Sequence, residues 1–236
     1  VELLKDWRLP APVVHDAAYT WLINDLWGAP KLRKYTYDRV EPLLMAGWGN
    51  TAEAHLIRGG YYIQYAWDAR GGGWASTVTD EQWRLMKERL GIARESLERS
   101  WTMKPLLDTA LRMQWVELGD SRGRKEMERW YKNAIELDPG NYQARMNKLN
   151  WIHEKWHGSV KEMLDFGKEC LTDTNGSAAL TLYEVQFELA KYHQLRGRGT
   201  EAEYLKQPAV WRDVKLSFET FFAAHPNETG WRHNYA

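Results

Sequence analysis

The feature that most constrains the fold is a proline that recurs after 34 residues. The segment "ARESLERSWTMKP" ends at Pro105, and "MERWYKNAIELDPGN" places its proline at Pro139. Another 34 residues on, "LTDTN" at 171–175 repeats the leucine and asparagine of "LDPGN" at 137–141, and a fourth closure ends at Pro226. A period of 34 residues is typical of the tetratricopeptide unit, which is one helix–turn–helix pair. The spacing therefore predicts a series of stacked helix pairs.

The second helix of each pair carries a stripe of small and aromatic residues that would pack on the first helix. The stripes are Ala93, Leu97, Ser100 and Pro105, then Met127, Tyr131, Ala134 and Pro139, and finally Val214, Phe218, Phe221 and Pro226. The candidate first helices span 52–70, 105–119, 141–156 and 177–197. Strand signals are nearly absent. We therefore predict an all-α fold, an irregular tetratricopeptide-like α-solenoid of about four helix pairs.

The predicted domain organisation is a cap followed by one continuous repeat domain. Residues 1–50 carry "HDAAYTWLINDLWG" and prolines at 10, 12, 30 and 42, which indicates an N-terminal helical cap and a loop. Residues 51–236 would then share a single core. An insertion at 196–210 interrupts the last unit, and its spacing leaves open whether that unit continues the stack or folds back over it.

Composition excludes several classes of protein. With 44% apolar residues, 27% charged residues and a formal net charge of zero, the chain is neither disordered nor a nucleic-acid-binding protein. Its single cysteine, Cys170, excludes an internal disulfide framework. No apolar run is long enough to span a membrane. We expect a soluble cytoplasmic protein of undetermined oligomeric state, or a periplasmic one if an N-terminal signal has been removed.

Two segments of the chain read "YYIQYAWDARGGGWASTVTDEQWRLMKERLGIARESLERSWTMKP" and "AIELDPGNYQARMNKLNWIHEKWHGSVKEMLDFGKEC". Both resemble an uncharacterised bacterial family, the domain of unknown function family 4034. The family has no known activity and no established catalytic residues, so the resemblance implies architecture only. Its pattern in the second segment centres on Trp156, Gly158 and Ser159 rather than on the two neighbouring histidines.

Those histidines belong to "HEKWH", which matches the zinc signature H-E-x-x-H. In a zinc hydrolase, His153 and His157 would bind the metal from one helix face, Glu154 would be the general base, and Glu184 could be a third ligand. Glu188 is an equally placed third ligand on the same predicted helix.

A structural interpretation of "HEKWH" competes with the zinc site, and we favour it. Ser159 and Glu162 form a predicted capping box for the next helix, and Gly158 then ends the preceding one. His157 would lie in the last turn of that helix and His153 on its apolar stripe. A nucleophilic Cys170 paired with His153 or His193 has no supporting signature. The "RGGGW" turn lacks the lysine and hydroxyl of a phosphate-binding loop.

The turns that join first to second helices carry arginines. Stacked units would align these turns into a basic rim able to hold an acidic partner. The alternative is that they are solvated arginines with no common role. Trp67 and Trp74, which flank "ARGGG", complete the candidate partner-binding set as aromatic anchors beside arginine. The arginines are Arg70, Arg122, Arg124, Arg196 and Arg198.

The sequence thus predicts a non-enzymatic protein-binding module without a cofactor, either an adaptor or an inhibitor of the immunity-protein type. Its partner would be another protein, with an acidic surface if the basic rim forms. Two alternatives stay open: a zinc-dependent hydrolase built on "HEKWH", and a structural subunit of a larger assembly.

Overall fold

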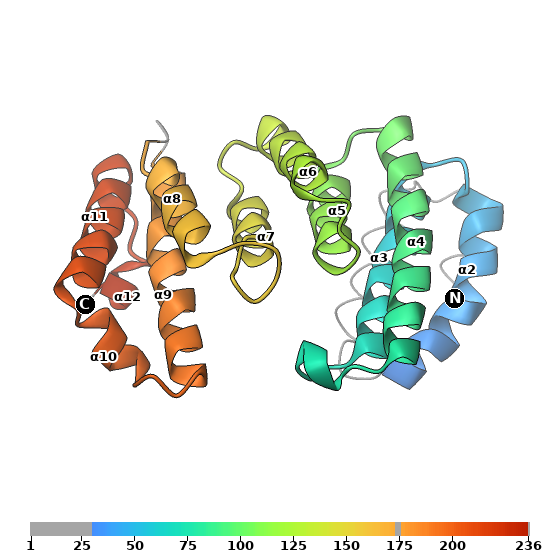
Figure 1. Ribbon diagram of the computed structural model, residues 1–236. Helices are drawn as coiled ribbons and strands as arrows, with labels where there is room; N and C mark the ends of the chain where they lie inside the picture. The colour runs from blue at the N-terminus through green and yellow to red at the C-terminus, as the bar shows by residue number, and fades with distance from the viewer. Residues whose placement is uncertain (1–29, 173–175, 236) are drawn as a thin grey trace. The chain divides into compact units, whose positions relative to one another are not determined.

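The structure is a computed structural model that describes residues 30–172 and 176–235. All regular elements in these ranges are helices and none is a strand, which confirms the all-α prediction (Figure 1). The chain divides into two compact units, 1–137 and 138–236, and clusters of buried apolar side chains lie within each of them. The predicted solenoid and the single core over 51–236 stay predictions.

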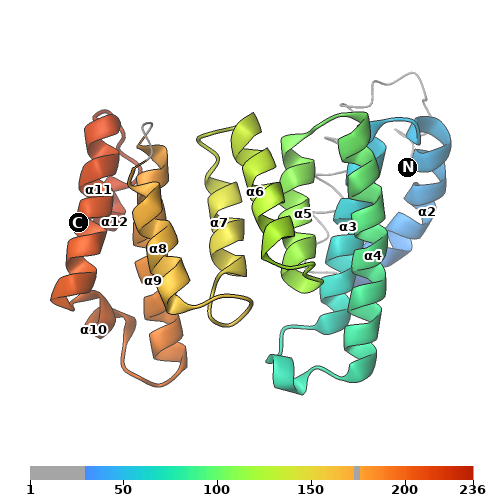
Figure 2. The ribbon, with the colours of Figure 1, turned by 45° about the horizontal axis from the view of Figure 1, so that its top comes forward.

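The first unit is organised around α3 and α4, which lie antiparallel and side by side in Figures 1 and 2. Gly59 of α3 allows the close approach, because a Cβ there would lie 2.5 Å from the Cγ atom of Leu97. Ala93 and Leu97 of the predicted stripe are fully buried at this contact. The elements are α2 (Pro30–Trp48), α3 (Ala52–Arg70), the 3-10 turn η3 (Ala75–Thr77), α4 (Asp80–Met103), α5 (Leu107–Gly119) and α6 (Arg124–Leu137).

Side-chain caps explain where α3 and α4 begin. Thr51 precedes α3 and its hydroxyl accepts a hydrogen bond from the Ala54 backbone N–H, which would otherwise be unpaired at the helix start. Thr79 and Gln82 form a complete capping box at the start of α4, with the Gln82 amide oxygen accepting the Thr79 N–H at 2.9 Å. These local signals fix where each of the two helices begins.

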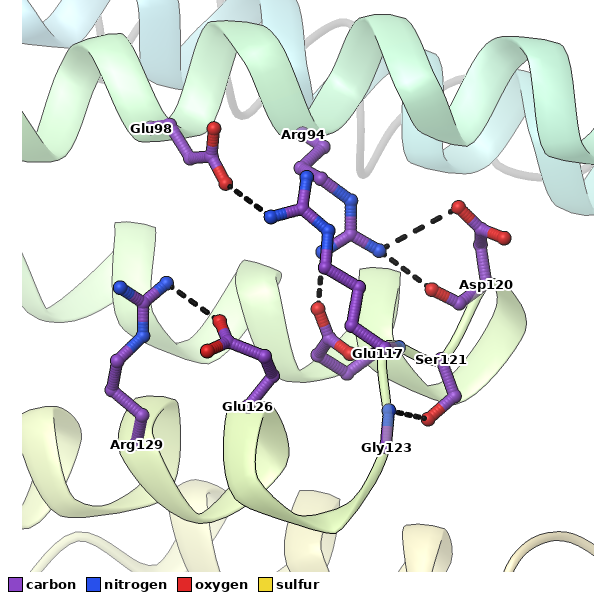
Figure 3. A network of polar contacts seen from close by, with 9 residues as sticks. Arg94, Glu98, Glu117, Asp120, Ser121, Gly123, Glu126 and Arg129 are labelled. Atoms are coloured by element: carbon purple, nitrogen blue, oxygen red, sulfur yellow. Dashed lines mark hydrogen bonds and ion pairs between the residues drawn. The ribbon is translucent and has the colours of Figure 1, made fainter.

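A buried ion pair joins α4 to the last turn of α5, next to the turn that leads into α6 (Figure 3). The Arg94 guanidinium donates to the Glu117 carboxylate, and both side chains are almost completely excluded from solvent. Arg94 also donates to the Asp120 carbonyl at 2.6 Å, and Glu117 accepts the backbone N–H of Arg122 at 2.8 Å. Both buried charges are therefore paired and hydrogen-bonded, which is the condition under which such charges are tolerated inside a protein.

The second unit is built on α9, against which α8, α10 and α11 pack. Ser217 joins α11 to the start of α9. Its hydroxyl donates to the Ala179 carbonyl at 2.5 Å and accepts the Tyr183 N–H at 3.2 Å. Phe218 and Phe221 of the predicted stripe lie in the core beside Tyr183. The elements are α7 (Tyr142–Trp151), α8 (Val160–Cys170), η4 (Ser177–Ala179), α9 (Leu180–Leu195), α10 (Glu201–Leu205), α11 (Pro208–Ala224) and α12 (Arg232–Tyr235).

The structure differs from the predicted elements near the N-terminus. It also shows that the insertion at 196–210 includes a helix. The predicted cap helix around 15–28 lies outside the described residues, and α2 occupies 30–48, where we expected a loop. Pro30 is compatible with a helix start, and Pro42 lies on an exposed face of α2. The insertion at 196–210 contains α10, which packs on α9, and Tyr204 donates to the Gln186 side chain at 3.2 Å.

The helix predicted over 141–156 is too long, because α7 ends at Trp151. A compact turn follows, in which the His157 N–H bonds to the Trp151 carbonyl at 3.2 Å and the Gly158 N–H to the His153 carbonyl at 3.4 Å. The apolar spacing of Ile152 and Trp156 continues the helical period, but these tertiary and turn contacts override it. Of the predicted capping box, the Ser159 cap is confirmed, since Ser159 accepts the Glu162 N–H at the start of α8, and the Ser159 hydroxyl donates to the Glu162 carboxylate at 2.9 Å.

Gly158 is the residue on which this turn depends, and its replacement tests the turn. A Cβ at Gly158 would lie 2.1 Å from the Ile152 carbonyl oxygen, which is a backbone atom and cannot move aside cheaply. We expect Gly158→Ala to lower the free energy of unfolding by about 2 kcal/mol or more. Gly140→Ala is the matched control in the same unit, because only ordinary contacts surround its Cβ position. Urea unfolding gives both values, and equal stability of the two variants would contradict the described turn.

Removal of one partner tests the buried ion pair. Glu117→Ala leaves the Arg94 charge buried without its carboxylate, and we expect a loss of about 3–5 kcal/mol in the free energy of unfolding. The double variant Arg94→Met with Glu117→Leu removes both charges and should be more stable than Glu117→Ala alone. Arg84→Ala breaks only exposed ion pairs on α4 and should leave the unfolding midpoint unchanged. A wild-type midpoint for Glu117→Ala would show that the pair is not buried.

Candidate binding site

The glycine-rich turn between α3 and α4 carries the most exposed tryptophan in the described part of the first unit. The side chain of Trp74 is 54% exposed, and the turn residues on both sides of it are exposed as well. Gly71 has a positive φ of 73°, which glycine adopts readily, and its N–H bonds to the Trp67 carbonyl at 3.0 Å to end α3. The turn thus reverses the chain immediately after α3 and presents an indole ring to solvent.

The Arg70 side chain stabilises the backbone of this turn. Its side chain is buried, and its Nη1 atom donates to the carbonyls of Gly71 and Gly73 at 2.9 and 3.0 Å. The guanidinium also lies 5.8 Å from the Trp67 ring and 5.4 Å from the Trp83 ring, within the range of a cation–π contact. Burial lowers the pKa of Arg70. The side chain predicted to contact a partner therefore shapes the turn instead of lying on its surface.

The other predicted first-unit residues have local partners. Arg122 forms an exposed ion pair with Glu98 at 3.2 Å, and Arg124 forms one with Glu128 at 3.0 Å on α6. Arg70 contacts α4 at Trp83, and Arg122 contacts the same helix at Glu98. These two positions are fifteen residues, or about 22 Å, apart along α4. Trp67 is half-buried, and its ring packs edge-on against Trp115 at 6.0 Å.

The remaining arginines, Arg196 and Arg198, lie in the second unit at the end of α9, and both are exposed. The Arg196 guanidinium is 5.9 Å from the ring of Tyr192. Within the first unit, Arg70, Arg122 and Arg124 do not form one compact basic patch, because Arg70 is buried far along α4 from the other two. Whether the five arginines act together on a partner stays a prediction.

The "HEKWH" segment does not have the geometry of the helical zinc signature, because α7 ends before it begins. His153 is buried, its Nδ1 atom accepts the Lys155 N–H at 3.1 Å, and its ring packs edge-on against Tyr192. His157 instead packs its ring on Trp151 at 4.9 Å. Within the described ranges, no group of three or more histidine, cysteine or acidic side chains is placed to hold a metal ion.

The other candidate reactive groups have ordinary structural partners. Tyr142 donates to the Glu184 carboxylate at 2.7 Å, and burial raises the pKa of Glu184. Cys170 is buried, and its burial raises the pKa of the thiol. A thiol that stays protonated is a poor nucleophile and a poor metal ligand.

One polar cleft contains residues that the sequence analysis did not identify. His55 and Arg58 of α3 line it together with Glu95 and Arg99 of α4. Their spacings, three residues on α3 and four on α4, place each pair on one helix face. A helical-wheel comparison could have found each pair separately, but only the packing of α3 on α4 shows that the two faces meet.

Comparisons of the chain with protein-family models, curated proteins and solved structures gave no match. The resemblance to family 4034 therefore stays a prediction, and the functional assignment depends on the geometry described above. Among the described helices, none is both long enough and apolar enough to cross a membrane.

The burial of His153 predicts a specific pH dependence of stability. Burial, with a smaller effect of the Lys155 charge, lowers the pKa of His153 from 6.5 to about 4. As the pH falls through this window the unfolded chain binds a proton that the folded chain does not, so stability falls by about 2 to 3 kcal/mol. His153→Asn keeps a hydrogen-bond acceptor but does not titrate. We expect its stability, measured by urea unfolding, to fall less than that of the wild type between about pH 7 and about pH 4.5. Equal losses would contradict the neutral buried histidine.

Proposed function

We propose that the chain is a non-enzymatic protein-binding module and that Trp74 is the anchor through which it contacts another polypeptide. The observation that carries this proposal is an indole that is 54% exposed on a turn whose backbone is held by the buried Arg70 side chain. Tryptophan is among the residues most enriched at the energetic centres of protein interfaces.

The rigidity of the turn supports a binding role over that of an incidental exposed side chain. Besides the two Arg70 hydrogen bonds, the Thr77 hydroxyl and backbone N–H both donate to the Trp74 carbonyl at 2.8 Å. The Gln82 side chain donates to the Arg70 carbonyl at 3.3 Å. An anchor that is ordered before binding loses less conformational entropy on association than a mobile one, which favours affinity.

The finer elements of the proposal follow from the sequence. The partner is another polypeptide, with an acidic surface if Arg122 and Arg124 contribute to recognition. The role is that of an adaptor or of an immunity-type inhibitor, by analogy with other small helical proteins, and the compartment is the cytoplasm.

Site-specific cross-linking tests the proposal directly. A photoreactive benzoylphenylalanine at position 74 should cross-link one polypeptide in cells that express the chain, and that polypeptide can then be identified and purified. We expect Trp74→Ala to weaken its binding at least tenfold in titration calorimetry, because a tryptophan anchor contributes about 2 kcal/mol or more.

Trp211→Ala is the matched control, because Trp211 is exposed to a similar extent, 48%, on α11 of the second unit. A binding partner specific to the turn keeps its affinity for Trp211→Ala. Equal losses in the two variants would identify nonspecific adhesion to exposed indoles and overturn the proposal. Wild-type binding by Trp74→Ala would overturn it as well.

A further inference from the structure

A polar cleft lies at the opposite end of the α3–α4 pair from the Trp74 turn. Two adjoining hollows of about 240 and 360 Å³ open where the end of α2 and the turn at 49–51 meet the later turns of α4. Met45, His55 and Arg99 line both hollows. Small-molecule sites are concave, and a small number of placed polar groups in them fix the orientation of the ligand.

His55 is the buried polar group of the cleft. Its side chain is 5% exposed, and its Nε2 atom donates to the Gly49 carbonyl at 3.0 Å, which assigns the proton of the neutral ring to Nε2. Burial is the main cause that lowers the pKa of His55, and the Arg99 and Arg58 charges act in the same direction. The Nδ1 atom is therefore a hydrogen-bond acceptor, and it has no partner among the described residues. Buried polar atoms without partners are uncommon and call for a physical explanation.

The charged groups of the cleft fall into two sets. Arg58 is already neutralised, because it donates to the Glu41 carboxylate at 2.7 Å and to the Ser96 hydroxyl. Glu95 and Arg99 lie one helical turn apart on the exposed edge of α4, and within the described part of the chain neither forms a hydrogen bond or an ion pair. The cleft thus offers one uncommitted cation and one uncommitted anion, beside a neutral histidine whose Nδ1 atom is buried.

We propose that this cleft binds a small zwitterion, either an amino acid or a dipeptide, with its carboxylate on Arg99 and its ammonium group on Glu95, next to the His55 ring. An arginine fork pairs best with a carboxylate, and an ammonium group supplies hydrogen-bond donors for the Glu95 carboxylate. A simple anion would lie close to Glu41 and Glu95, and a simple amine would lie close to Arg58 and Arg99. A ligand with both charges avoids either repulsion.

Titration of the full chain with paired probes tests this site independently of protein binding. The probes are the twenty standard L-amino acids and glycylglycine, compared with acetate and methylamine, which carry the two charges separately. We expect at least one zwitterion to bind ten or more times more tightly than either single-charge probe. In ¹⁵N spectra of histidine-labelled protein, that ligand should shift the His55 Nδ1 resonance, which His55→Asn assigns.

Variants at the exposed edge keep the fold and separate the two charges. Arg99→Gln and Glu95→Gln should each weaken the zwitterion at least tenfold. Arg84→Gln is the control, because this arginine lies on the same helix about 22 Å away. Undiminished binding by Arg99→Gln, acetate binding as tight as that of every zwitterion, or no binding and no His55 shift with any probe would each overturn the proposal.

Discussion

The first unit depends on the buried charge pair between Arg94 and Glu117, because it joins α4 to the last turn of α5, next to a turn at 120–123 that has no large apolar side chain. The other face of α4 packs on α3, where Gly59 allows a close approach. The position of α4 is therefore fixed by close packing on α3 and by the ion pair with α5. Replacing one member leaves an unpaired buried charge. The ion pair therefore constrains where α5 ends and where α6 begins.

The sequence predicted the helices well where local signals and tertiary packing agree. The bounds of α3, 52–70, coincide with the prediction, since Thr51 caps its start and Gly71 ends it. The predicted helix bounds were wrong where tertiary packing overrides the apolar periodicity. The apolar spacing through Ile152 and Trp156 is that of a helix, yet α7 ends at Trp151 because Gly158 closes a turn on the Ile152 carbonyl. Nothing in the spacing of apolar residues encodes that closure.

The candidate site was predicted in part, for a similar reason. Composition pointed to the "ARGGG" turn, and Trp74 is indeed exposed there, but the same pattern assigned Arg70 to the surface. A guanidinium can satisfy two carbonyls and pack on two rings at once, and the sequence does not show whether its neighbours are a partner's atoms or its own. The cleft around His55 could not be predicted, because its residues come from two helices whose relative rotation is set by the contact of Gly59 with Leu97.

The two proposed surfaces lie at opposite ends of one rigid element. His55 is near the start of α3 and Arg70 is its last residue, fifteen positions and about 22 Å later. A ligand at one end can affect the other only if the packing of α3 on α4 has two arrangements of similar free energy. The close contact at Gly59 leaves little room for a second arrangement, because Leu97 already fills the space that a Cβ would need. Zwitterion binding and polypeptide binding should therefore be energetically independent, so that the two functions can be separated by mutation.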